Sequence, residues 1–176
     1  NVGKSTLFNR IIGRRKSIVT DVAGTTRDVV LATAEWLGST FWLADTAGIY
    51  GEKESDEIIR SVEKQISESI EEADVIVFVV DVQNGITDLD TEIAAMLRKS
   101  KKNVILTVNK TDNNDLQYMA PEFYKLGVGD PLCISAISGF GSGELLDAIL
   151  PFLSQIEGDG LYDDSLPRIA IVGRPN

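Results

Sequence analysis

Two short stretches, NVGKST (residues 1–6) and IAIVGRPN (residues 169–176), decide the fold that this sequence predicts. A phosphate-binding loop follows the pattern G-x-x-x-x-G-K-[ST], with a strand before it and a helix after it. Residues 3–5 match the second half of that pattern, and residues 173–176 match its first half. Each stretch therefore supplies half of the same kind of loop, at opposite ends of the chain.

Length and composition predict a globular domain with a substantial core. The chain has 176 residues, of which 43% are hydrophobic and 25% charged, ordinary values for a folded domain. The net charge of −10 disfavours nonspecific binding to nucleic acid phosphates, and the absence of histidine excludes imidazole catalysis. A single cysteine, Cys133, excludes an internal disulfide. No apolar run has the length of a membrane span, so we expect no membrane partner.

Short β-branched runs alternate with amphipathic stretches, a pattern typical of α/β architecture. We expect a mainly parallel six-stranded sheet with one antiparallel hairpin strand, formed around Gly38, and helices on both faces. The expected strands are residues 29–36, 41–44, 75–81, 103–109, 132–135 and 168–172. The expected helices are residues 4–12, 54–71, 89–99, 116–126 and 143–153.

The two half-loops also suggest how the chain is divided. Residues 1–154 are expected to form one domain that lacks its first strand and the first half of its phosphate loop. Residues 155–167, rich in acids and glycine, read as a linker, and residues 168–176 as the start of a second domain of the same kind. We expect residues 168–172 to fill the slot of the missing strand, in their own sheet or, in a strand-swapped oligomer, in a neighbour's. Alternatively, the authentic first strand lies outside these residues and the tail is a stub.

The residues predicted to bind phosphate come from the loop at the start of the chain and from the end of a strand. Backbone N–H groups at a helix N-terminus surround phosphate oxygens, and we expect Lys4 to reach the β- and γ-phosphates and the Ser5 hydroxyl to ligate Mg²⁺. In DTAG, Asp45 suits a water-mediated Mg²⁺ contact, and the Gly48 N–H suits the γ-phosphate. An ordinary Asp-Thr turn is the alternative for this motif.

The polar loop TDVAGTTRD (residues 20–28) lies between the first helix and the hairpin. Such a loop can close over the γ-phosphate and Mg²⁺ and relax once phosphate leaves. We favour Thr26 over Thr25 as its metal ligand, and an ordinary surface loop is the alternative. Lys4, Thr26 and Gly48 are then the candidate catalytic residues.

Two further motifs predict recognition of guanine. In VNKTD, Asn109 and Lys110 can support the loop and the base, while Asp112 can accept hydrogen bonds from guanine N1–H and its exocyclic amine. In ISAIS, which includes Ser135, the Ala136 N–H can bind guanine O6. Adenine lacks the donor pair that Asp112 would read, which disfavours a kinase or ATPase. All these motifs fall at carboxyl ends of strands, where ligands bind in open α/β sheets.

The motifs NVGKSTLFNR, GTTRD, DTAGI, VNKTD, EFYKLGVGDP and ISAISGFGSGELLDAI together resemble the first GTPase domain of the EngA (Der) family of ribosome-assembly GTPases. The resemblance covers residues 1–153, and RIAIVGRPN resembles the opening of that family's second GTPase domain. It implies a P-loop GTPase in the bacterial cytoplasm that acts in large ribosomal subunit assembly. The implied partners are GTP and GDP, a second GTPase domain, a KH-like domain and the large subunit.

The resemblance also bears on mechanism. Many relatives carry a water-orienting glutamine where this chain has Ile49, which implies slow hydrolysis or stimulation by K⁺. It implies that Asn1 helps to bind K⁺, whereas Arg27 is a second candidate for charge stabilisation or a surface partner of Asp28. We therefore expect a slowly hydrolysing GTP switch, with a regulatory module that holds GTP or GDP without turnover as the alternative. The nucleotide-binding residues so predicted are Asn1, Gly3, Lys4, Ser5, Thr6, Asp45, Asn109, Lys110, Asp112, Ser135 and Ala136, with Ser5, Thr26 and Asp45 for Mg²⁺.

Overall fold

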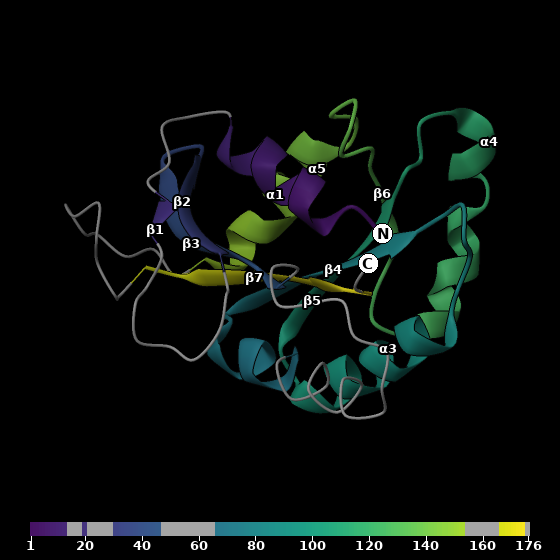
Figure 1. Cartoon of the computed structure of the whole chain (residues 1–176), viewed down its shortest axis with the longest axis horizontal. Coiled ribbons are helices and arrows are strands. Elements are labelled where there is room, and N and C mark those ends of the chain that lie inside the picture. The colour runs from purple at the N-terminus through teal and green to yellow at the C-terminus, as the bar shows by residue number, and fades with distance from the viewer. Residues whose placement is uncertain (14–18, 21–29, 47–65, 154–165, 175–176) are drawn as a thin grey trace.

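A computed structural model describes residues 1–13, 19–20, 30–46, 66–153 and 166–174. Within these ranges the chain forms a layered α/β structure, with a central sheet between two layers of helices (Figure 1). The strands are β1 (Val19–Thr20), β2 (Val30–Trp36), β3 (Ser39–Asp45), β4 (Val75–Asp81), β5 (Asn103–Asn109), β6 (Leu132–Cys133) and β7 (Arg168–Gly173). The helices are α1 (Lys4–Ile12), α3 (Asp88–Ser100), α4 (Asn114–Gln117), α5 (Ser142–Ile149) and the 3₁₀ turns η2 (Ala120–Leu126) and η3 (Leu150–Phe152).

The last strand of the chain lies in the middle of the sheet, whose order is β1-β2-β3-β7-β4-β5-β6. Ile169 is paired in parallel with Leu43 of β3 on one side and with Val75 of β4 on the other. This is the position in the main sheet expected for residues 168–172, and Figure 1 shows β7 in yellow between strands of much lower residue number. The division of the chain into domains remains a prediction.

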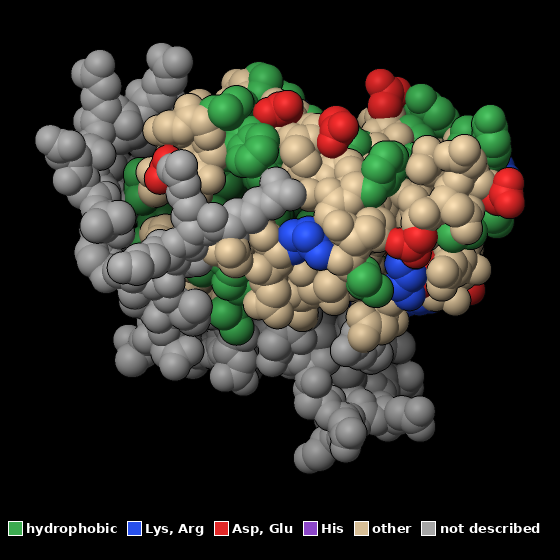
Figure 2. Space-filling view, turned by 90° about the horizontal axis from the view of Figure 1, so that it is seen from above, with side chains coloured by type: hydrophobic (Ala, Val, Ile, Leu, Met, Phe, Trp, Pro, Cys, Tyr) green, Lys and Arg blue, Asp and Glu red, His purple; other side chains and the backbone are tan. Residues whose placement is uncertain are grey.

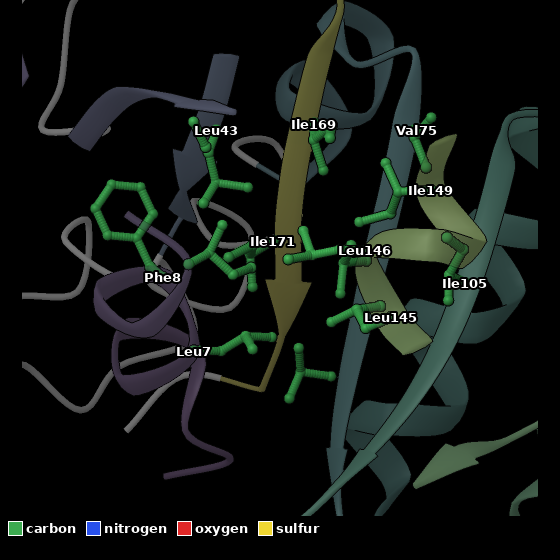
Figure 3. Packing of buried hydrophobic residues seen from close by; sticks show 14 of the residues in the cluster. Leu7, Phe8, Leu43, Val75, Ile105, Leu145, Leu146, Ile149, Ile169 and Ile171 are labelled. Carbon is green, nitrogen blue, oxygen red and sulfur yellow. The ribbon is translucent and has the colours of Figure 1, made fainter. Parts of the chain in front are cut away.

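Alternating side chains explain why β7 is stable in this position. Ile169 and Ile171 belong to the apolar cluster that α1 and α5 cover, while Ala170 and Val172 belong to the cluster on the opposite face. Figure 3 shows Ile171 between Leu7 of α1 and Leu146 of α5. A parallel strand buried on both faces needs apolar residues at every position, and IAIV supplies them.

The hairpin of β2 and β3 is confirmed, with its turn at Leu37 and Gly38. The two strands are antiparallel, and Trp36 pairs with Ser39 across the turn. Leu37 has φ 46° and Gly38 φ 85°, which is the pair of positive φ values of a two-residue type I′ turn. The glycine therefore supplies the backbone geometry that the sequence predicted for it.

The fold class is confirmed, but several elements differ from the expected ones. A two-residue strand, β1, pairs with β2 at the start of the segment read as a loop, so the described residues contain seven strands. The single helix expected at 116–126 is instead α4 followed by η2, because Pro121 lies in the first turn of η2 and has no N–H to continue an α-helix. Pro151 likewise ends α5 in the 3₁₀ turn η3. Of the helix expected at 54–71, only 66–71 fall within the described residues, and these are helical.

Among the described residues on the face drawn in Figure 2, acidic and apolar side chains are scattered among polar ones, and few basic side chains are seen. Among the most exposed large apolar side chains are those of Tyr118, Tyr124 and Ile137. None of the helices in the described ranges is long and apolar enough to cross a membrane.

Candidate nucleotide-binding site

The candidate site lies where the parallel strands β3, β7, β4 and β5 reach the same edge of the sheet. Their last residues are Asp45, Gly173, Asp81 and Asn109, respectively, and the three polar ones are buried. The start and the end of the described chain also lie close together at this edge (Figure 1). Parallel packing thus gathers the polar ends of several strands around the start of α1.

The phosphate side of the site is the turn that leads into α1. Gly3 caps the helix with φ 92°, a left-handed conformation that favours glycine. A Cβ at this position would lie 2.3 Å from the Asn109 Nδ2 atom, so a larger residue has no room. The Gly3 N–H donates to the Asn1 side-chain oxygen at 3.3 Å, and the Gly3 carbonyl accepts from Leu7 N–H at 2.9 Å.

Lys4 is almost completely buried at the first position of α1, with 3% of its surface exposed. Its Nζ donates to the Arg174 carbonyl at 2.6 Å, which ties α1 to the residue that follows β7. Burial lowers the pKa of Lys4 to about 8, the Asp45 carboxylate opposes this shift, and the Arg174 charge adds to it. A buried ammonium with a lowered pKa is well suited to an anionic ligand, since phosphate oxygens would restore the favoured charge.

Asn109 joins the phosphate side to the base side of the site. Its Nδ2 donates to the Val2 carbonyl at 2.8 Å, and its Oδ1 accepts from the Ala136 N–H at 2.9 Å. The side chain is buried at the end of β5, so both hydrogen bonds are shielded from water. One amide therefore holds two loops in register, whereas the role of Asn109 in binding the nucleotide stays a prediction.

The base side also contains Asp112 and Ser135, which the structure brings into direct contact. The Ser135 hydroxyl donates to Asp112 Oδ1 and accepts from the Ser138 N–H at 3.1 Å. Below them, the buried Thr111 donates from Oγ1 to the Ile134 carbonyl at 2.8 Å. Asp112 remains exposed, so its carboxylate is oriented by one hydroxyl and still accessible to a ligand.

Lys110 is held by a residue that the sequence analysis did not single out. Its Nζ lies 2.6 Å from Oδ2 of Asp81, a carboxylate that is 1% exposed at the end of β4. The same carboxylate accepts from Gln83 N–H at 2.9 Å and from Asn84 Nδ2 at 2.7 Å. The position of Asp81 at the carboxyl end of a buried strand was the signal that could have identified it.

The residues predicted for Mg²⁺ have suitable oxygen donors. Ser5 is exposed in the first turn of α1, and Asp45 is buried at the end of β3, where its charge acts on Lys4. Within the described ranges there is no cluster of three or more histidine, cysteine or acidic residues that could hold a metal. Mg²⁺ keeps several waters and needs only one or two protein carboxylates or hydroxyls beside substrate phosphates. The donor set therefore fits Mg²⁺ bound together with a nucleotide.

Some predicted residues cannot be placed. Thr26, Gly48, Ile49 and the loop at 20–28, apart from Thr20, lie outside the described residues. Thr6 is exposed on the first turn of α1, next to Ser5. Of the predicted set, the structure brings together Gly3, Lys4, Asp45, Asn109, Lys110, Asp112, Ser135 and Ala136 at one edge of the sheet.

A family model described as 50S ribosome-binding GTPase matches residues 1–110. The chain belongs to this family. Its sequence is 56% identical to GTPase Der of Phocaeicola vulgatus over 176 residues, which is 100% of this chain and 40% of that protein. GTPase Der of Bacteroides fragilis is 54% identical over 177 residues, and that of Clostridium perfringens 51% over 176, with the same coverage. The chain thus spans about 40% of the length of these curated relatives.

Solved structures support the same family and fold. Era, in complex with MgGDPNP and nucleotides 1506–1542 of 16S ribosomal RNA, has a TM-score of 0.70 and 34% identity, covering 95% of this chain and 57% of that one. The G domain of the FeoB iron transporter of T. maritima has a TM-score of 0.56 and 26% identity, covering 86% and 92%. The chain is therefore a P-loop GTPase domain with an Era-like fold.

Proposed function

We propose that this GTPase domain binds GTP with Mg²⁺ at the edge of the sheet described above and hydrolyses it slowly. The observation that carries the proposal is the pair of hydrogen bonds made by Asn109, which link the loop before α1 to the loop after β6. One of these loops carries a phosphate-binding motif, and the other lies beside a carboxylate suited to guanine. A ligand that spans both loops needs a phosphate at one end and a purine at the other.

On the base side, Asp112 would accept from guanine N1–H and the exocyclic amine, with its carboxylate oriented by Ser135. Lys110, fixed by Asp81, would support the base. The Ala136 N–H, which donates to Asn109, would share or transfer this hydrogen bond to guanine O6. This set of donors and acceptors matches guanine and mismatches adenine.

On the phosphate side, Lys4 would exchange the Arg174 carbonyl for β- and γ-phosphate oxygens. Ser5 and Asp45 would hold Mg²⁺, which neutralises developing charge on the phosphates when it is bound, and Thr26 and Gly48 would complete this side. Asn1 would contribute to a K⁺ site. With Ile49 in place of a water-orienting polar residue, positioning and electrostatics alone would drive a slow reaction.

The biological role that we propose is a nucleotide switch in assembly of the large ribosomal subunit. Two findings support it: the family model is described as 50S ribosome-binding, and the curated relatives are named GTPase Der. In a longer protein of that kind, the partners would be a second GTPase domain, a KH-like domain and the ribosomal subunit, in the bacterial cytoplasm.

Single-turnover GTP hydrolysis, measured in K⁺ and in Na⁺ at equal ionic strength, tests the proposal. We expect slow GTP cleavage that is faster in K⁺ than in Na⁺. In an Asn1→Ala variant, the cleavage rate should be the same in the two salts. Tight GTP binding with no cleavage in either salt would favour a regulatory module that holds the nucleotide without turnover. Equal binding of ATP and GTP would contradict the guanine site itself.

A further inference from the structure

Arg10 connects the helix of the phosphate side to the loop of the base side. It lies in the last turn of α1, the helix that begins at Lys4. Its Nε donates to the Ala136 carbonyl and its Nη2 to the Ile137 carbonyl, across 126 and 127 positions of sequence. The contact therefore links two segments that are far apart in sequence.

The loop that Arg10 contacts is a closed turn. The Ser135 N–H donates to the Phe140 carbonyl at 2.9 Å, and the Gly139 N–H donates to the Ser135 carbonyl at 2.7 Å. The guanidinium covers this turn, since a Cβ added to Gly139 would lie 2.7 Å from Arg10 Nη1 and 3.4 Å from Cζ. Both the hydrogen bonds and the packing of Arg10 thus converge on residues 136–139.

Fixing the carbonyls also fixes the N–H groups. In a trans peptide the C=O and the N–H of the next residue point in opposite directions. Because the Ala136 carbonyl faces Arg10, the Ile137 N–H is directed away from α1. The Ala136 N–H is set separately by Asn109, so Arg10 and Asn109 orient successive peptides of the same loop.

We propose that Arg10 is a positioning residue for recognition of guanine O6. By holding the Ala136 and Ile137 carbonyls, it orients the Ile137 N–H, next to the Ala136 N–H that Asn109 positions, as a further donor to O6, without touching the base. The planar fork of arginine suits two adjacent carbonyls, whereas a lysine offers one compact charge. The inference rests on the guanine site proposed above, because it explains how that site holds its O6 donors.

The test compares GTP with 2-aminopurine riboside triphosphate, which keeps the exocyclic amine but has neither O6 nor the N1–H. In an Arg10→Met variant of this chain, loss of charge-assisted hydrogen bonds to the loop should weaken GTP binding about tenfold. Binding of the analogue should change by less than about twofold, because it never used the O6 donors. An Arg10→Lys variant should retain part of the preference for GTP.

Arg98 offers a matched control. It lies in the last turn of α3 and donates from Nη1 to the Leu126 carbonyl, so it forms the same kind of contact with the end of η2. An Arg98→Met variant should lower the melting temperature without changing the ratio of the two affinities.

Three results would be decisive against the proposal or its basis. The role of Arg10 would be overturned, with the guanine site left intact, if Arg10→Met lost equal affinity for GTP and for the analogue. An Arg98→Met variant that changed the ratio of the two affinities as much as Arg10→Met would overturn it too. If the unsubstituted chain binds GTP no better than the analogue, the guanine site itself is wrong, and the inference falls with it. If Arg10→Met lowers the melting temperature strongly, the ratio of GTP affinity to analogue affinity in Arg10→Lys decides whether Arg10 positions the loop.

Discussion

The base side and the phosphate side of the candidate site are built in different ways. On the base side, Asn109 ends β5, Asp112 and Ser135 follow neighbouring strands, and the hydrogen bonds of these residues to one another and to Ala136 and Ser138 span at most 27 positions in sequence. On the phosphate side, the Lys4 ammonium contacts the carbonyl of Arg174, 170 positions away. The first arrangement is set by two adjacent strands, whereas the second depends on β7 entering the middle of the sheet.

This difference predicts how substitutions on each side should change nucleotide binding. A change on the base side should alter the choice of base and affect GTP and GDP equally, because both carry guanine. A change on the phosphate side should affect GTP more than GDP, and a change in β7 should affect the whole sheet. Variants of single residues can therefore separate the two sides by their nucleotide profiles.

The largest effect should come from β7. Ile171 is completely buried between α1 and α5, and its β7 backbone pairs with both β3 and β4. An Ile171→Ala variant should lose about 3 kcal/mol of unfolding free energy, because a large core side chain is removed and a cavity remains. Denaturant unfolding measures this loss.

The control for Ile171 is Ile137, which is 75% exposed in the base-side loop. An Ile137→Ala variant should change the unfolding free energy by less than about 0.5 kcal/mol. Similar losses in the two variants would mean that β7 does not hold the sheet together as the structure indicates.

Sequence patterns predicted the fold best where a strand depends on its own composition. β4 and β5 have the bounds expected for them, because VIVFVVD and NVILTVN are apolar runs that suit burial on both faces. Prediction was less accurate where an element depends on a distant partner or on a residue that interrupts a helix. The short β1 is an example of the first, and the division of 116–126 into α4 and η2 is an example of the second. A two-residue strand is defined only by its partner.

The site shows the same limit. The motif around Asn109 and Asp112 predicted residues that the structure places together with Ser135 and Ala136. Arg10 and Asp81 were missed, since an arginine at a helix end usually reads as solvated and the sequence does not show which carbonyls it will meet. Such positioning contacts become visible only when strands and helices are placed in space.

Asp112→Asn should produce the next largest effect. The substitution replaces one carboxylate acceptor with an amide donor facing the guanine amine, a mismatch that should weaken GTP and GDP binding about tenfold to a hundredfold. Xanthosine triphosphate, which has a carbonyl in place of that amine, should bind better than GTP. Titration with the three nucleotides measures the switch, and an unchanged preference for GTP would exclude Asp112 as the base-reading residue.

The pH dependence of binding should distinguish the phosphate side. The pKa of Lys4, lowered to about 8 by burial, should rise when phosphates surround it, so binding takes up a proton above pH 8. GTP affinity should therefore fall about tenfold between pH 7 and pH 9. By the same linkage, the chain without nucleotide should become more stable as the pH rises from about 8 toward 10.5.

Lys4→Arg is the control for this titration, because a guanidinium stays charged throughout the range. Its affinity for GTP should show a much flatter pH profile, whatever its absolute value. A slope that survives the substitution would assign the titration to another group.

The smallest effect should come from Asp81→Asn, which acts on the base side through Lys110. The amide keeps one acceptor oxygen for the neighbouring N–H donors, but its NH₂ group replaces the charged oxygen that lies 2.6 Å from Lys110 Nζ. Lys110 has φ 67°, a left-handed conformation that is uncommon for residues other than glycine. We expect GTP and GDP binding to weaken alike by about threefold, since a single partly exposed ion pair contributes little.

Asp147→Asn is the matched control, because the Asp147 carboxylate accepts from Trp36 Nε1 at 2.7 Å in a contact between α5 and β2. It should leave both affinities unchanged. A larger loss for GTP than for GDP in Asp81→Asn would place Lys110 on the phosphate side instead, where its ammonium would act on the γ-phosphate. The ratio of the two losses, rather than their size, therefore decides to which half of the site the Asp81–Lys110 pair belongs.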